Sequence, residues 1–154
     1  MVFPIEERVH DLYWEHDINC ARTMLTCLCE LFHVDLEEQT FNSAIGLHGA
    51  GGFRAQCGLV EGTLMFIGIF YSQKGKSDSD IVSLCYQYAD EFTQKYGSLT
   101  CCDLRPNGFN SNDPPHVCEN LTGSAIKFSI EFIKSKDNNN VKMKNTLQIP
   151  AAKA

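Results

Sequence analysis

Apolar residues recur at intervals of three and four along most of the chain, which is the repeat expected for amphipathic α-helices. The longest run predicts a helix of about four turns. Its apolar positions are Ile18, Ala21, Met24, Leu25, Leu28, Leu31 and Phe32. Similar runs predict helices over 5–13, 35–46, 81–97 and 116–132. The helix over 35–46 is expected to begin at Asp35, which forms a capping box with Glu38. The helix over 81–97 is expected to end at Gly97.

A further helix is expected over residues 56–72. Its segment 63–71 is apolar on all sides, so this helix should be buried at the centre of the fold, although a β-strand is the rival assignment for so short an apolar run. Gly62 and Gly68 are interpreted as points where neighbouring helices approach closely. The sequence therefore predicts a single-domain bundle of about five to six helices around a buried central helix.

The chain of 154 residues fits one domain. We expect this domain to span residues 1–135 and a poorly structured C-terminal tail to follow over 136–154, where Asn, Lys and a late Pro accumulate. The longest apolar stretch has eight residues, whereas a bilayer span needs about 20, so no membrane insertion is expected. The acidic N-terminal segment lacks the apolar core of a signal peptide, which favours a cytoplasmic location.

Charge and motif searches exclude several partners. The formal net charge is −6, and an acidic chain is a poor ligand for nucleic acid. Gly75-Lys76-Ser77 copies the end of a P-loop, but Phe70 stands where its first glycine is required. Gly49-x-Gly51 copies the start of a dinucleotide fingerprint without its third glycine, so no nucleotide cofactor is expected. The sequence has no CxxCH, so no covalently attached haem is expected either.

The eight cysteines need an explanation, because a chain of this length can bury a core without disulfides. Cys27 and Cys29 lie two positions apart on a predicted helix, about 200° around its axis, and cannot both reach one metal ion. Cys85 lies on the apolar face of another helix. For these three, packing in the core is the favoured role.

Cys57 follows a glycine-rich loop, residues 46–58, and opens the expected central helix. Free N–H groups at a helix N-terminus stabilise a thiolate, and Arg54 would add positive charge. The glycines either turn the chain only, or let backbone N–H groups approach a sulfur ligand. Cys20 and Cys118 are also expected in first turns of helices, and Cys101-Cys102 borders an irregular loop. Four thiolates are the usual complement of zinc or an iron–sulfur cluster, although no pair has CxxC spacing.

The histidines are less informative. His10, His16 and His33 are expected at exposed or half-buried helix positions. His48 lies in the glycine loop, and His116 lies two positions before Cys118. Either of these two is a candidate to donate a hydrogen bond to a metal ligand, or to serve as a ligand itself.

The order of these motifs resembles a family of redox-active proteins named for the pattern C…CGAxxG…C…C, to which split-Soret cytochrome c is similar. The segments that carry the resemblance are Asn19-Cys20-Ala21, Gly46 to Gly52, Cys57-Gly58-x-x-x-Gly62, Gly97-Ser98-x-x-Cys101-x-Asp103-Leu104 and Cys118, within residues 8–133. This chain departs from the family in two places. Leu59 replaces the alanine of the pattern, and the loop after Leu104 is long and rich in Asn.

The resemblance implies that the four family cysteines are Cys20, Cys57, Cys101 and Cys118, although which of Cys101 and Cys102 is functional is left open. It implies a helical redox domain whose four cysteines bind a metal, as ligands of an iron–sulfur cluster for electron transfer or redox sensing. Gly49, Gly51, Gly52, Arg54 and Gly58 are expected to surround these ligands. A redox partner protein is expected, and a homodimer is implied by the haem-containing relative. Two alternatives remain: a metal-free thiol–disulfide or sulfur-relay protein, and a helical interaction domain with a vestigial site. No reaction is implied, so enzymatic activity is left open.

Overall fold

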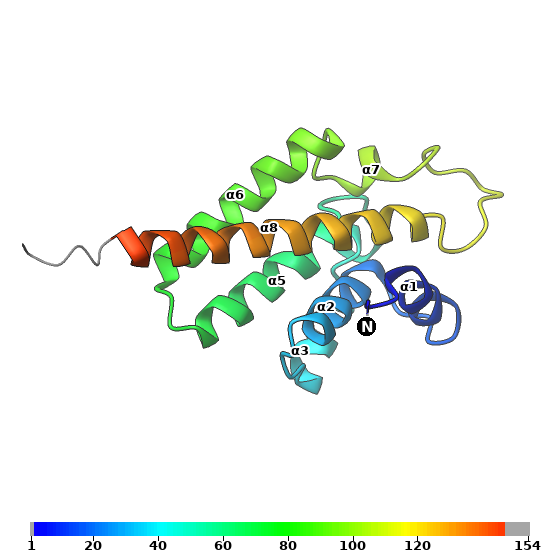
Figure 1. The fold of residues 1–154 in the computed structure, drawn as a ribbon. Helices are drawn as coiled ribbons and strands as arrows, with labels where there is room; N and C mark the ends of the chain where they lie inside the picture. The colour runs from blue at the N-terminus through cyan, green and yellow to red at the C-terminus, as the bar shows by residue number, and fades with distance from the viewer. Residues whose placement is uncertain (1, 147–154) are drawn as a thin grey trace, which may run out of the picture.

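The computed structural model describes residues 2–146, with side chains described for 2–137, and this part of the chain is helical and contains no β-strand (Figure 1). Its helices are α1 (Ile5–Trp14), α2 (Cys20–Leu31), α3 (Glu38–Ser43), α4 (Gly49–Gly52), α5 (Gly58–Gln73), α6 (Asp78–Tyr96), α7 (Cys101–Leu104) and α8 (Glu119–Thr146). The predicted all-α fold is confirmed. The count exceeds the expected five to six because α4 and α7 are single turns of four residues.

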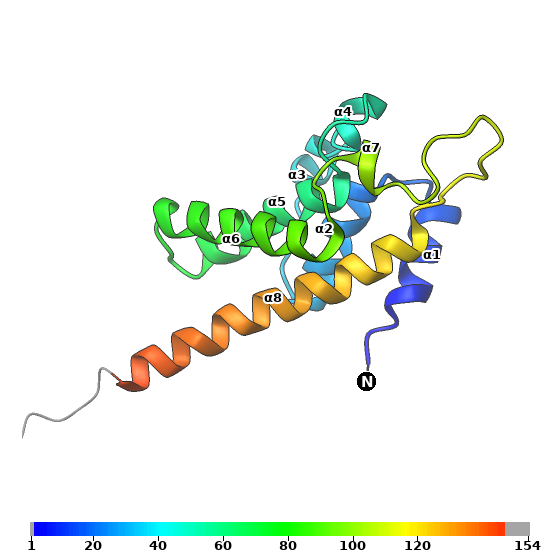
Figure 2. The ribbon, with the colours of Figure 1, turned by 90° about the horizontal axis from the view of Figure 1, so that it is seen from above.

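Helix α5 is the centre of the bundle, as its apolar sequence predicts. It packs most extensively on α2 and also contacts α6 and α8 (Figures 1 and 2). Phe66, Ile67 and Tyr71 of α5 are fully buried. The apolar composition of α5 matches this position, although Leu64, Met65, Gly68 and Ile69 form a face of the helix that is only partly buried.

The contact between α5 and α2 depends on the absence of a side chain at Gly62. A Cβ atom there would lie 2.9 Å from the Met24 Cβ and closer still to the Ala21 carbonyl oxygen. The interpretation of Gly62 as a point of close approach is therefore confirmed. The same interpretation of Gly68 is wrong, because a Cβ there would meet nothing within 4 Å.

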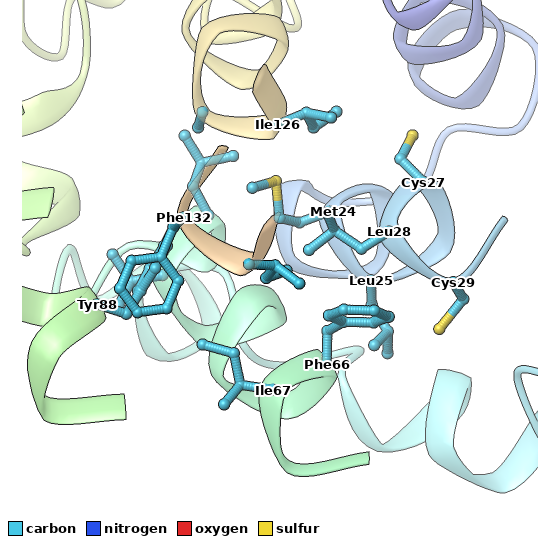
Figure 3. Packing of buried hydrophobic residues seen from close by; sticks show 14 of the residues in the cluster. Met24, Leu25, Cys27, Leu28, Cys29, Phe66, Ile67, Tyr88, Ile126 and Phe132 are labelled. Carbon is cyan, nitrogen blue, oxygen red and sulfur yellow. The ribbon is translucent and has the colours of Figure 1, made fainter. Parts of the chain in front are cut away.

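Three cysteines, Cys27, Cys29 and Cys57, belong to the apolar core. Cys27 and Cys29 are buried in α2, and Figure 3 shows their side chains on different sides of that helix. Cys85 is half-buried and packs against the same core from α6. The placements of Cys27, Cys29 and Cys85 agree with the packing role predicted for them.

Most helix boundaries differ from expectation by one to three residues, and two of the differences have a physical reason. Helix α3 begins at Glu38 after Glu37 rather than at Asp35, and no side chain caps it, so the expected capping box is wrong. Helix α8 continues to Thr146, past the expected domain end at residue 135, because extending a packed helix by one residue costs far less than starting one. The last part of the expected tail, 147–154, lies outside the described residues. Helix α6 does end at Gly97, which adopts the left-handed conformation with φ of 88°.

Among the residues that the structure describes, none of the helices combines the length and the apolar character required to cross a bilayer.

Replacing Gly62 by alanine should destabilise the fold by about 1–3 kcal/mol, because the new methyl group must push α5 away from α2. Gly68→Ala is the matched control in the same helix. It should stabilise the protein by about 0.5–1 kcal/mol, since alanine favours helix and open space surrounds the site. Urea unfolding of both variants measures the difference, and equal effects would contradict the role given to Gly62.

Candidate functional site

The four cysteines singled out by the sequence each lie at the start of a different helix. Cys20 and Cys101 are the first residues of α2 and α7, Cys57 immediately precedes α5, and Cys118 immediately precedes α8. The local sequence explains the first of these starts, because the Asn19 side chain accepts a hydrogen bond of 2.9 Å from the Arg22 N–H. Helix α8 begins with the Thr122 N–H donating to the Cys118 carbonyl at 2.8 Å.

A short antiparallel bridge joins the segments that precede α5 and α7. Gln56 pairs with Thr100. The Cys57 N–H donates to the Leu99 carbonyl at 2.8 Å, and the Cys101 N–H donates to the Ala55 carbonyl at 2.7 Å. The bridge therefore brings Cys57 and Cys101 together although they are far apart in sequence.

Two glycines leave room for two of the cysteines. A Cβ at Gly58 would overlap the Cys20 Sγ and would lie 2.9 Å from both the Ala21 nitrogen and the Leu47 oxygen. A Cβ at Gly49 would lie 3.1 Å from the Cys101 Cβ. The glycine after Cys57 thus has a steric reason, because the sulfur of Cys20 occupies the place of its missing side chain.

The glycine loop forms one left-handed turn. Residues 49–52 all have positive φ, with values of 67°, 56°, 66° and 85°. Such a turn strains any residue with a side chain, so the glycine density follows from the backbone conformation. Gly51 and Gly52 face open space, unlike Gly49 and Gly58. Of the glycines expected to surround the cysteines, the structure therefore places two against them.

The four cysteines lie within electrostatic range of one another. The pKa of Cys20 is raised to about 12, first by burial and then by the neighbouring Cys57, Cys118 and Cys101. Cys57 is affected by Cys101 and Cys118, and Cys118 by Cys101, so every pair among the four interacts. Cys27, Cys29 and Cys85 show no such interaction with the four.

At Cys57, burial raises the pKa of the thiol more than the helix N-terminus lowers it. The backbone N–H groups of Leu59 and Val60 lower its pKa, as a helix start should. Removal from water is the larger effect, and the pKa of Cys57 is raised to about 11. The expectation of a thiolate stabilised at this position therefore does not hold for the metal-free thiol.

Two arginines lie beside the cysteines. Arg105 lowers the pKa of both Cys101 and Cys118, and Arg54 lowers that of Cys101, against a larger effect of burial. The ring of Phe109 lies 4.0 Å from the Arg54 guanidinium carbon and 4.5 Å from that of Arg105. These cation–π contacts hold the long loop that follows Leu104 against the arginines beside the cysteines. Arg54 was expected here from its sequence position, whereas nothing in the sequence pattern indicated Arg105.

The other side of the cluster is aromatic. Tyr13 is buried, and its pKa is raised well above the usual value by burial and by Cys20, Cys118 and Cys57. His116 stacks on Tyr13 with ring centroids 5.0 Å apart. His48 contacts the Asn19 side chain at 3.2 Å, beside Cys20 in sequence. Tyr13 was missed because its spacing marks it only as a core residue of α1.

The cysteines fit an iron–sulfur or zinc site in chemical type, but they are not arranged as a ligand sphere. Among the described residues, no group of three or more His, Cys, Asp or Glu side chains is placed to hold a metal ion. All eight cysteines are free thiols, and Cys102 is exposed to solvent. The ligand role of Cys20, Cys57, Cys101 and Cys118 therefore stays a prediction.

In reduced, metal-free protein, alkylation should distinguish the buried thiols from the exposed one. Raised pKa values keep Cys20 and Cys57 protonated at pH 7, and iodoacetamide reacts with thiolates, so these two should resist modification until the pH approaches 11–12. Cys102 should react first because it is exposed. Peptide mass spectrometry over a pH series measures each site, and rapid labelling of Cys20 at pH 7 would contradict the burial described here.

Gly58→Ala should be more disruptive than Gly51→Ala. The methyl group at position 58 must displace the Cys20 sulfur, whereas alanine at position 51 meets only the strain of a positive φ. We expect a loss of more than about 2 kcal/mol for Gly58→Ala and about 1 kcal/mol for Gly51→Ala. Alkylation of Cys20 at pH 8 should accelerate only in the first variant. Identical behaviour of the two variants would show that Cys20 does not pack on Gly58.

Comparison with known proteins gave one match. No curated protein and no solved structure matches the chain. A family model does match over residues 18–132, a range that includes all four helix-start cysteines and the glycine loop. Over most of its length, the chain therefore belongs to the family described as "Putative redox-active protein (C_GCAxxG_C_C)".

Proposed function

We propose that this protein transfers or senses electrons through an iron–sulfur cluster whose ligands are Cys20, Cys57, Cys101 and Cys118. The observation that carries the proposal is the grouping of four thiols, each at the start of a different helix and each interacting with the other three. Membership of a redox-active family supports the same conclusion.

The electrostatics of the site favour a bound cationic centre. Buried thiols are costly to ionise in the absence of a positive charge, and iron supplies that charge directly to the sulfur. A cysteine-ligated cluster provides one-electron chemistry over a wide range of potentials. The Leu59 and Val60 N–H groups would stabilise the Cys57 thiolate, and Arg105 would do the same for Cys101 and Cys118. Such a site needs reduced cysteines, so we place the protein in the cytoplasm.

A metal-free thiol protein is the second candidate. It is favoured by the absence, among the described residues, of three metal-binding groups placed around one point. In this case two of the four thiols would form a disulfide, releasing two protons and giving two electrons to a disulfide or quinone acceptor. The raised pKa values of Cys20 and Cys57 make them weak nucleophiles at neutral pH, which argues against their starting such an exchange.

The visible spectrum of anaerobically purified protein distinguishes the two candidates. A cluster gives sulfide-to-iron charge-transfer bands, together with iron and acid-labile sulfide in stoichiometric amounts. Changing Cys20, Cys57, Cys101 or Cys118 singly to serine should abolish or strongly reduce these bands. Cys85→Ser is the matched control and should keep them, since Cys85 does not interact with the four. It should also cost at most a few kcal/mol of stability.

Each outcome has a distinct meaning. Colourless, iron-free protein that forms one disulfide with mild oxidant supports the second candidate and contradicts the first. Colourless protein whose thiols remain inert contradicts both. Loss of iron in Cys85→Ser but not in Cys57→Ser would refute the assignment of the ligands.

A further inference from the structure

A chain of ring contacts leads from the four-cysteine cluster to the surface. Tyr13 stacks on His116 with centroids 5.0 Å apart and an interplanar angle of 12°. His116 in turn meets the edge of Trp14, also at 5.0 Å. Because Trp14 directly follows Tyr13 in α1, the three rings form one compact unit held by both covalent and packing contacts.

The inner end of this unit is tied to a cysteine by hydrogen bonds. The hydroxyl groups of Tyr13 and Thr122 lie 2.6 Å apart, and the Thr122 hydroxyl donates to the Cys118 carbonyl at 2.9 Å. Tyr13 also lies within electrostatic range of Cys20 and Cys57. The buried ring is therefore adjacent to the proposed redox centre.

The outer end reaches solvent. Trp14 is the only tryptophan of the chain, and its side chain is 46% exposed. Its indole N–H donates to a Glu119 carboxylate oxygen at 3.0 Å, and the other oxygen of that carboxylate lies 2.7 Å from His10 Nδ1. Large aromatic side chains that are fixed in orientation yet exposed are typical anchors of protein interfaces.

Carboxylates dominate the surface beside Trp14. They line a shallow groove made by Glu6, Glu7, His10, Asp11, Glu15 and Glu119. Glu6 pairs with Lys127, Asp11 with Arg8, and Glu119 with His10. Glu7 and Glu15 form no ion pair with any residue that the structure describes, so this face keeps a net negative charge. A protein that docks here must bring positive charge.

We propose that Trp14 and the α1 carboxylates form the docking surface for a one-electron carrier protein with a basic face, and that the Tyr13–His116–Trp14 contact connects that carrier to the four cysteines. The electron-transfer part of the inference rests on the proposed function. One electron leaves the reduced centre and the oxidised carrier accepts it, and no bond is broken and no proton moves.

The opposite approach to the cluster is less suited to such a carrier. Around Cys101 and Cys102, the charges of Arg54 and Arg105 are offset by Asp103 of α7 and by Asp113, which pairs with Arg105 at 3.2 Å, so this side has no net negative charge to attract a basic protein. Phe53 is exposed on that side of the glycine loop, but no aromatic contact connects it to the cysteines among the described side chains. Charge therefore favours the α1 face.

Binding tests the surface independently of any metal. Ferricytochrome c, a basic haem protein, serves as the probe in isothermal titration calorimetry at low and high salt. The double variant Glu7→Lys/Glu15→Lys should raise the Kd at least about tenfold and remove most of its salt dependence. Asp78→Lys/Asp90→Lys, at two exposed positions of α6, changes the net charge by the same amount, is the matched charge control and should change the Kd far less. Equal effects of the two charge changes, or no binding by the unmodified protein, would overturn the docking surface.

Rates test the route. Stopped-flow reduction of the same probe by the reduced, cluster-loaded protein should slow at least about tenfold in Trp14→Ser, because an interface anchor is lost, and far less in Trp14→Phe, which keeps a ring against His116. The visible spectrum and the reduction potential should stay unchanged in both variants. An unaltered rate in Trp14→Ser would overturn the route. Purified protein without iron would refute the proposed function and the route together, while the calorimetry would still decide the docking surface.

Discussion

The close packing of α5 on α2 is the constraint on which both the core and the cysteine site depend. Gly58 and Gly62 lie one turn apart on α5, so both face α2. At Gly62 the missing side chain admits the backbone of Ala21, and at Gly58 it admits the sulfur of Cys20. One helix contact therefore buries the apolar core and, at its end, fixes Cys20 next to the start of α5.

Two features of the fold change the ionisation of the cysteines in opposite directions. Helix starts favour ionised sulfur, whereas the surrounding apolar atoms disfavour it. At Cys20 the second effect wins, and a pKa of about 12 in place of 9 corresponds to roughly 4 kcal/mol against the thiolate. Arg54 and Arg105 reduce this imbalance only at Cys101 and Cys118. Ionisation of the two more buried thiols, Cys20 and Cys57, therefore requires a further positive charge, such as that of a bound metal.

The sequence predicted the helices because their apolar periodicity is local information, and for the same reason it predicted Cys20, Cys57 and Cys118 near helix starts. It did not predict the short helix α7, so Cys101 was expected only at the border of an irregular loop. It did not predict the start of α3, since Glu37 takes the cap position there without a side-chain hydrogen bond. Arg105 and Tyr13 reach the cluster through tertiary contacts, one from the long loop and one from α1, and spacing along the chain carries no signal of such contacts. The glycine loop was interpreted correctly as irregular. The sequence did not show that Gly51 and Gly52 are needed for the left-handed backbone, whereas Gly49 and Gly58 also leave room for cysteines.

The four cysteines are held with unequal rigidity. Cys20 and Cys57 are fixed by the α2–α5 contact, which belongs to the core. Cys101 begins a helix of only four residues, too short to be stable by itself, which is anchored by the bridge to residues 54–56 and by hydrogen bonds of 2.8 and 2.9 Å from Ser98 and Thr100 to Asp103. Moving α7 would disturb few buried contacts, whereas moving α5 would disrupt the core. The ligand set that we propose therefore requires movement of α7 rather than of α5, because no group of three or more metal-binding side chains is preformed among the described residues.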